Sequence, residues 1–173
     1  MNSHFNGKTY VMAELSDTDL IILKMLQENA REKLETIAAE TGLSVATVQR
    51  HIRNLRAEGA ILKETAVVAP EAAGFAMTFL VFVEMERERI DQLDAFRRRA
   101  KADPQVQQCY YITGEADFAL VVLCRDMADF ERVTHRLFFE DANVKRFRTS
   151  VVMSRTKVGL EVPLTGPPST DTA

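Results

Sequence analysis

Residues 44–58 carry side chains suited to contact a nucleic-acid duplex. Arginine can pair with guanine edges in the major groove, and asparagine and glutamine can pair with adenine edges. On a helix that advances about 100° per residue, Val45, Val48, Ile52 and Leu55 fall on one stripe. The opposite side then carries polar and small side chains, with Gln49 at its flank: Ala46, Thr47, Arg50, Arg53, Asn54 and Ala57.

Positive charge is concentrated on this segment of an acidic chain. Residues 44–58 hold three arginines against one glutamate, a net charge of +2, whereas residues 15–43 hold three basic and six acidic residues, a net charge of −3. The whole chain of 173 residues carries −3. A DNA-binding protein needs a local basic surface rather than a basic composition. The plainer interpretation is a solvated face on a small helical bundle.

Three helices are expected to position this face. Ser16 and Asp19 have the spacing of a capping box at the start of the first helix. A second, short helix is expected at residues 34–40. Gly42 can take the left-handed conformation that ends it, and Ser44 can cap the third helix, which runs to about residue 58.

Two helices joined by a short turn that contains glycine form a helix-turn-helix. Residues 61–68 follow as a short β-wing. We therefore predict an N-terminal winged helix-turn-helix that contacts double-stranded DNA through Ser44, Thr47, Gln49, Arg50, His51, Arg53, Asn54 and Lys63.

The second half of the chain predicts an α+β domain. Strands are expected at residues 75–86, 106–113, 117–125 and 144–153, because these segments are rich in β-branched and aromatic residues. Helical spacing marks residues 89–102, and Asp126 can cap a helix that runs to about residue 139. The order β-α-β-β-α-β is that of a ferredoxin-like fold, an antiparallel sheet with both helices on one face.

Two strands of this sheet are apolar on both faces, at residues 79–83 and 120–123. The helices cover one face, so another surface must cover the second. A second copy of the same sheet is the simplest cover, since homo-oligomers most often form two-fold interfaces. The alternative cover is the N-terminal domain. A dimer would also present two recognition helices to a two-fold operator.

The turn at residues 113–117 is the best candidate for a small-molecule site. Backbone N–H groups in such a turn can receive a carboxylate. Asp117 or Glu115 could receive an ammonium group, and two hydroxyls on the last strand could add hydrogen bonds. The residues alone favour a plain hairpin, in which Gly114 serves only the turn, over a ligand site. The predicted effector contacts are Thr113, Gly114, Glu115, Ala116, Asp117, Thr149 and Ser150.

Several motifs together resemble the Lrp/AsnC family, the leucine-responsive and asparagine-responsive regulators. They are LSDTD at residues 15–19, IAAETGLS at 37–44 and TGEADF at 113–118, within a resemblance that covers about residues 15–160. The resemblance implies a winged helix-turn-helix joined to a ferredoxin-like effector-sensing domain. It also implies dimers that assemble further, often into octamers, and that bind an amino acid or a related metabolite at the seam between dimers.

Two positions depart from the family pattern. His51 stands where the family commonly has arginine, and Arg50 precedes it. Ala116 stands where an aromatic residue is common in the effector loop, and a smaller side chain there could reshape the pocket. The resemblance therefore does not imply which ligand this chain binds.

The domain boundaries follow from these elements. We expect a flexible arm at residues 1–14, the winged helix-turn-helix at 15–69, a linker at 70–74, the ferredoxin-like domain at 75–158 and a largely disordered tail at 159–173. The N-terminus does not read as a secretory signal, and no apolar run reaches the roughly 20 residues that span a bilayer. Cys109 and Cys124 are expected to be free thiols in a reducing cytoplasm.

Two other classes of function compete with a DNA-binding regulator. Sirohaem decarboxylases look like the same family, but the sequence shows no nucleophile–base pair, no phosphate loop and no metal set, so no enzyme and no cofactor are expected. His4, His51 and His135 are widely separated in the sequence, so they do not suggest a metal site. An architectural protein that compacts DNA would bind with little sequence preference. The basic runs at residues 97–101 and 145–148 are interpreted as solvated faces, or as further DNA contacts in an oligomer.

Overall fold

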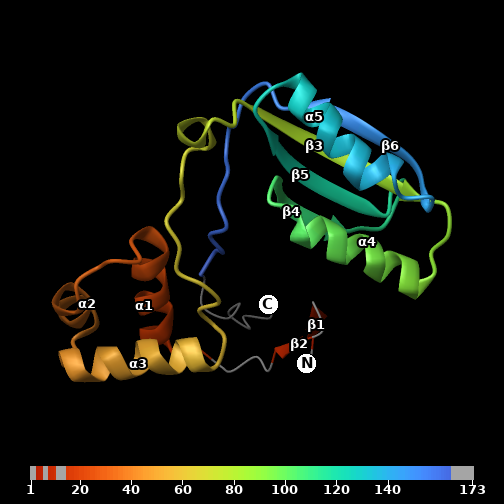
Figure 1. The fold of residues 1–173 in the computed structure, drawn as a ribbon. Coiled ribbons are helices and arrows are strands. Elements are labelled where there is room, and N and C mark those ends of the chain that lie inside the picture. Colours follow the sequence, from red (N-terminus) through yellow and green to blue (C-terminus); the bar gives the residue numbers. More distant parts are fainter. Residues whose placement is uncertain (1–2, 6–7, 11–14, 165–173) are drawn as a thin grey trace, which may run out of the picture. The chain divides into compact units, whose positions relative to one another are not determined.

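The computed structural model describes residues 3–5, 8–10 and 15–164 of the chain. They form two compact units, one built from residues up to 66 together with residues 159–164, and one built from Val67–Val158. The first unit contains the predicted DNA-binding helices, and the second contains the sheet (Figure 1).

Three helices make the body of the first unit: α1 (Asp17–Glu28), α2 (Leu34–Thr41) and α3 (Val45–Ala57). The capping box at the start of α1 is confirmed, because Ser16 Oγ accepts from the Asp19 N–H at 3.2 Å and Asp19 Oδ2 accepts from the Ser16 N–H at 3.1 Å. Gly42 ends α2 with a φ of 69°, and Ser44 caps α3 through the Thr47 N–H. The core they enclose contains Ile22, Leu23, Ile37, Ala38, Val48, Ile52 and Leu55.

The predicted apolar stripe of α3 is wrong at one position. Val48, Ile52 and Leu55 are buried, but the Val45 side chain is 38% exposed. Val45 is the first residue of the helix and lies almost one turn before Val48, so the buried stripe of α3 begins only at Val48.

The predicted β-wing is also wrong, because residues 61–69 contain no strand. Ile61 turns back onto the helical core, and its N–H donates to the Leu55 carbonyl at 3.0 Å. Beyond it the chain is exposed, as Leu62, Val67 and Val68 show. A strand needs a neighbour to satisfy its N–H and C=O groups, and within the described chain this segment pairs with none. A 3₁₀ turn, η1 (Pro70–Ala73), lies within the predicted linker at residues 70–74.

The ends of the chain differ in part from the expected flexible arm and tail. Ser3–Phe5 (β1) and Lys8–Tyr10 (β2) pair as two short antiparallel strands within the segment that was expected to be a flexible arm. Residues 159–164 join the first unit, where Leu164 packs against the helical core. The remainder of the predicted tail, residues 165–173, lies outside the described residues.

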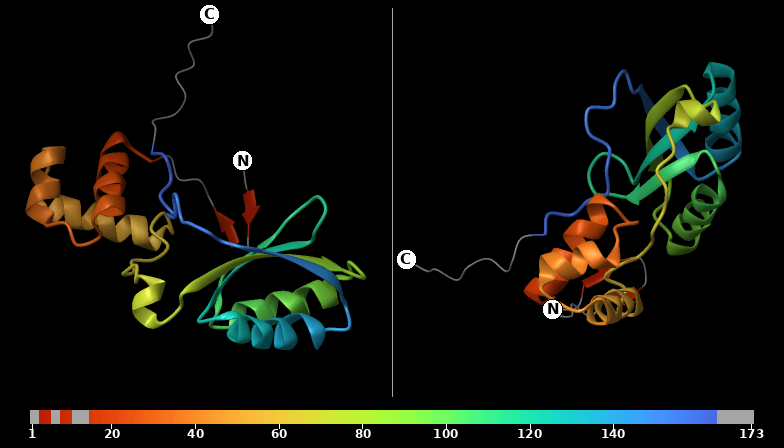
Figure 2. Two further views of the ribbon diagram at one scale, coloured as in Figure 1. Left: turned by 90° about the horizontal axis from the view of Figure 1, so that it is seen from above. Right: turned by 90° about the vertical axis from the view of Figure 1, so that its left-hand side faces the viewer.

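The second unit has the predicted βαββαβ order and belongs to the α+β class. Its strands are β3 (Met77–Met85), β4 (Val106–Tyr111), β5 (Phe118–Cys124) and β6 (Val144–Val151), arranged as β4-β5-β3-β6 with all neighbours antiparallel. The helices α4 (Ile90–Ala102) and α5 (Met127–Thr134) lie on one face of this sheet (Figure 2).

The last helix departs from its expected form. Asp126 caps α5 as predicted, accepting from the Asp129 N–H at 2.7 Å. The helix does not continue as a regular α-helix to residue 139, because it changes at His135–Phe139 into a π-helical turn, η2. The switch keeps Leu137 and Phe138 buried, while Phe139 remains exposed.

The two faces of the sheet have different environments. Toward the helices, Phe79, Val81 and Val83 are completely buried, and the Phe79 ring stacks on Phe130 with centroids 3.8 Å apart. Successive residues of a strand point to opposite faces. On the other face Leu80 is 38% exposed and Phe82 37% exposed. The expected second apolar face is therefore present, and its cover by a second copy stays a prediction.

Candidate nucleic-acid interface and ligand pocket

The outward face of α3 is assembled as the sequence predicts. Gln49, Arg50, Arg53 and Asn54 are exposed on the helix whose opposite side is anchored in the core. Within residues 15–164, neither Arg50 nor Arg53 forms an ion pair with another side chain. Their guanidinium groups are therefore available for an external partner.

Three further predicted DNA contacts, Ser44, Thr47 and Lys63, lie at or beyond the ends of α3, and the unpredicted Arg56 lies near them. Ser44 and Thr47 lie at the start of α3, where their hydroxyl oxygens are 2.9 Å apart and Ser44 also accepts from the Thr47 N–H. These two side chains therefore serve the helix cap. Lys63 is exposed on the extended segment after α3. Arg56 is held by Glu64 through contacts of 2.8 and 3.0 Å from one guanidinium nitrogen to both carboxylate oxygens.

His51 is half-buried and contacts the start of α1, unlike the exposed side chains of α3. Its Nδ1 lies 2.8 Å from Asp19 Oδ1, and Asp19 is also the acid of the capping box on α1. Burial opposes ionisation of Asp19, but hydrogen bonds from Ser16 and His51 outweigh it and hold the pKa of the Asp19 carboxyl below its ordinary value. The interaction ties the recognition helix to the first helix.

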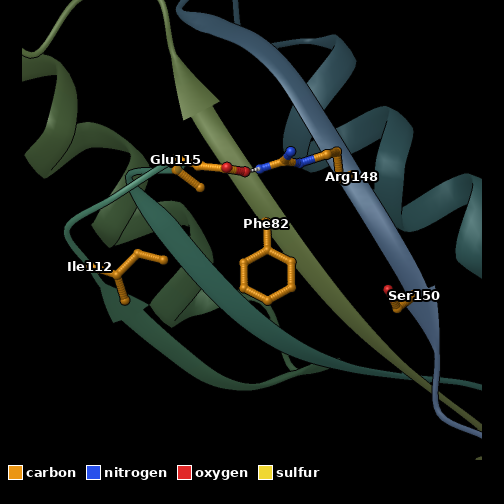
Figure 3. A pocket seen from close by; sticks show the side chains of 6 residues that line it. Phe82, Ile112, Glu115, Arg148 and Ser150 are labelled. Atoms are coloured by element: carbon orange, nitrogen blue, oxygen red, sulfur yellow. Dashed lines mark hydrogen bonds and ion pairs between the residues drawn. The ribbon is translucent and has the colours of Figure 1, made fainter.

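A pocket of about 400 Å³ opens on the face of the sheet that carries no helices. Figure 3 shows its side chains: Phe82 from β3 lies at the centre, Arg148 and Ser150 come from β6, and Glu115 and Ile112 come from the segment between β4 and β5. An Arg148 nitrogen lies 2.9 Å from Glu115 Oε2. Apolar walls and a pair of opposite charges therefore meet in one small site.

The structure brings only some of the predicted effector residues to this pocket. Glu115, Ala116 and Ser150 line it, whereas Thr113 and Gly114 do not. Gly114 has a φ of 118°, which only glycine adopts easily, and so it serves the turn.

Asp117 fixes the loop to the neighbouring strand. Its Oδ2 accepts from the Met85 N–H at 2.7 Å, and its own N–H donates to the Val83 carbonyl at 2.9 Å. The predicted role as an ammonium acceptor would compete with these bonds. Asp117 is better described as a residue that positions Glu115 and Ala116.

Thr149 and Ser150 cannot both reach one site. In the sheet register Ser150 pairs with Leu80 and Thr149 pairs with Val81, which places the two hydroxyls on opposite faces. Ser150 lies on the pocket face, and Thr149 lies on the face that carries the helices. The prediction that both serve the same ligand is wrong for Thr149.

Three pocket residues were missed by reasoning from the sequence: Phe82, Ile112 and Arg148. Phe82 was treated as part of an apolar run, and Arg148 as part of a basic surface. The available signal was the period of two along β6, because Arg146, Arg148 and Ser150 share one face. The pairing of Phe82 with Arg148 needs the register between β3 and β6, which the sequence does not give.

The remaining candidate groups are the two cysteines and the side chains that could bind a metal ion. Burial, with a smaller contribution from Asp129, raises the pKa of the Cys124 thiol to about 11, and burial also raises the pKa of Cys109. Both cysteines are free.

Within the described ranges, no group of three or more His, Cys, Asp or Glu side chains is placed to hold a metal ion. None of the described helices has the length and apolar character needed to cross a membrane.

Comparisons with known families match both units. Residues 15–61 match a winged helix-turn-helix DNA-binding model, and residues 78–162 match the Lrp/AsnC ligand binding domain. An uncharacterised HTH-type transcriptional regulator from Sinorhizobium fredii is 39% identical over 163 residues, which cover 94% of this chain and 96% of the relative. The Bkd operon transcriptional regulator of Pseudomonas aeruginosa is 35% identical over 120 residues, covering 69% of this chain and 78% of the relative.

Solved structures match as well. A transcriptional regulator from Neisseria meningitidis, crystallised as an L-Met complex, superposes with a TM-score of 0.81 at 26% identity and covers 87% of this chain and 97% of its own. A feast or famine regulatory protein from M. tuberculosis, complexed with L-methionine, gives a TM-score of 0.77 at 27% identity, with 86% and 98% of the two chains covered.

Proposed function

The chain belongs to the Lrp/AsnC family of transcriptional regulators, and on that premise we propose that it binds specific DNA sites through α3 and changes its activity when an amino acid occupies the sheet pocket. The observation that carries the proposal is the exposed face of α3, where Arg50 and Arg53 are free of ion pairs within the described chain. The proposed role is regulation in the cytoplasm rather than catalysis, since the matched relatives are named as regulators.

The contacts of α3 divide by chemistry. Gln49, Arg50, Arg53 and Asn54 present the donors and acceptors that read base edges in a major groove. Ser44 and Thr47 at the helix N-terminus, and Lys63 beyond its end, suit phosphate contacts, which fix the register of the protein on the duplex. We assign His51 a positioning role, because its bond to Asp19 orients α3 instead of meeting DNA.

The pocket suits a free α-amino acid with an apolar side chain. Arg148 can pair with the α-carboxylate and Glu115 with the α-ammonium group, so the ligand would replace the ion pair that these residues make with each other. Phe82, Ile112 and Ala116 offer an apolar wall to the side chain, and Ser150 can add a hydrogen bond. The L-methionine complexes of two similar regulators support this class of ligand.

We propose a homodimer as the functional unit, assembling further as far as an octamer. The half-exposed Leu80 and Phe82 are the residues that a second sheet would cover. A dimer would present two recognition helices to two half-sites about one helical turn apart. Because Phe82 also lines the pocket, a partner on this face would help to enclose the ligand.

The proposal is tested by measuring how tightly variants of α3 bind a DNA fragment that the wild-type protein binds. Arg50→Ala and Arg53→Ala should each weaken binding by about tenfold or more, because each removes a contact to a base or phosphate. Arg87→Ala is the matched control: Arg87 is also exposed, but it lies in the second unit just after β3 and outside both basic runs. Circular dichroism should show all three variants folded. Affinities that are equal for the wild type and both α3 variants at fixed salt would contradict the proposal.

A further inference from the structure

The chain returns to the helix-turn-helix after it has completed the sheet. Residues 159–164 belong to the first unit, although the rest of the chain after Ala66 builds the second. The Gln27 side chain on α1 pairs with the backbone of Val162: its Nε2 donates to the Val162 carbonyl at 3.1 Å, and its Oε1 accepts from the Val162 N–H at 2.8 Å. A single amide thus reproduces the two bonds of a strand pair.

A hydrophobic contact reinforces this anchor. Leu164 packs against the core formed by α1, α2 and α3. Leu160, in the same segment, is 82% exposed. The segment is therefore held at defined positions, by Gln27 and by the core, rather than along its whole length.

The beginning of this returning stretch, just after β6, is anchored in the second unit. The Val152 N–H donates to the Thr78 carbonyl at 2.9 Å, directly after β6 ends. The Arg155 guanidinium donates to Thr78 Oγ1 at 2.6 Å and lies 3.4 Å from Glu71 on η1. Thr78 is buried, so its hydroxyl gives Arg155 a fixed point at the base of β3.

We propose that residues 152–164 form a return tether, which carries the state of the pocket on β6 to α1 of the helix-turn-helix. The inference rests on the proposed function of that pocket. Ser150 lines the pocket and lies only two residues before Val152, the first anchored residue of the tether. A shift of β6 on ligand binding would therefore reach both anchors through the covalent chain.

The tether restricts the helix-turn-helix more than one linker could. The chain already passes from the first unit to the second between Ala66 and Val67, and the return segment is a second connection in parallel. From Arg155 to Val162 the chain has seven steps, which can span at most about 25 Å when fully extended. A domain held by two short connections keeps less freedom than a domain held by one. The plainer role is a strap that only stabilises the helices. Such a strap would need the anchors at Val162 and Leu164, but it would work equally well if the connection between the two units were longer.

The length of the tether can be changed without touching its anchors. An insertion of about six Gly and Ser residues after Lys157 would slacken the connection while leaving Arg155, Val162 and Leu164 in place. Leu164→Ala removes one anchor. Leu160→Ala is the matched control, because it makes the same change in the same segment at an exposed side chain.

The first measurement needs neither DNA nor effector. Spin labels on cysteines introduced at Glu35 in α2 and Arg98 in α4, with the native cysteines replaced by alanine, report the spread of distances between the two units. We expect one narrow distribution for the parent and the Leu160→Ala variant, and broader distributions for the insertion and Leu164→Ala. Equal widths in all four proteins would overturn the tether.

The second measurement adds function, with L-methionine as the probe and a duplex selected for binding. L-methionine should change the DNA affinity of the wild type by at least about fivefold, as allosteric ligands typically do, and that of the insertion variant by less than twofold. A full response in the insertion variant would reduce the segment to a structural strap and overturn the inference. A wild type that binds no DNA would instead refute the proposed function, and the distance measurement would still decide on the tether.

Discussion

Single residues decide which side chains of the recognition helix remain available to DNA. Asp19 is the clearest example, since one carboxylate caps α1 and also holds His51 of α3. Arg56 is likewise occupied by Glu64, whereas Arg50 and Arg53 are left without an ion pair in the described part of the chain. The histidine at position 51 therefore links α1 to α3, and we expect the DNA contacts to come from its neighbours.

Asp19→Asn should destabilise the protein in a pH-dependent way. At pH 7 the variant should lose about 1 kcal/mol of unfolding free energy, the usual contribution of a cap. The folded-state pKa of Asp19 is lowered, so its stabilisation is complete above the unfolded pKa of about 4 and is lost as the pH falls through the folded value. Urea unfolding from about pH 7 down to pH 3 should show the difference between wild type and variant shrinking. A constant difference would mean that the carboxylate charge plays no part.

At the scale of elements, the sequence predicts what local chemistry determines. The caps at Ser16, Ser44 and Asp126 and the left-handed Gly42 depend on a few neighbouring residues, and all four predictions are confirmed. The β-wing fails because a strand depends on a partner, which no local pattern supplies. The pocket was only half predicted for the same reason. Its loop has a motif, but Phe82 and Arg148 meet through the register of β3 with β6.

The register of β6 makes a sharp prediction for two adjacent hydroxyls. Ser150→Ala should reduce the rise in melting temperature that L-methionine gives, because Ser150 lines the pocket and a ligand stabilises the state that binds it. Thr149→Ala should leave that rise unchanged, since Thr149 lies on the opposite face. The two variants control for each other in a thermal-shift titration. Equal losses from both would contradict the assignment of faces.

At the scale of the whole molecule, the sensing unit carries two features that call for a partner. One is the half-exposed apolar face around Leu80 and Phe82, and the other is a pocket on that same face. A second copy would bury the first and help to close the second. It would also supply a second recognition helix, without which one α3 offers few contacts for useful specificity. Assembly, ligand binding and DNA recognition are thus expected to depend on one another.

The most direct test of the central claim is a selection of binding sites from a library of random duplexes by the purified protein. We expect enrichment of a two-fold related sequence whose half-sites lie about 10 base pairs apart, and loss of that enrichment in Arg53→Ala. Retention of duplexes with no common sequence would identify an architectural DNA-binding protein. Failure to retain any duplex would contradict the assignment of α3 as a recognition helix.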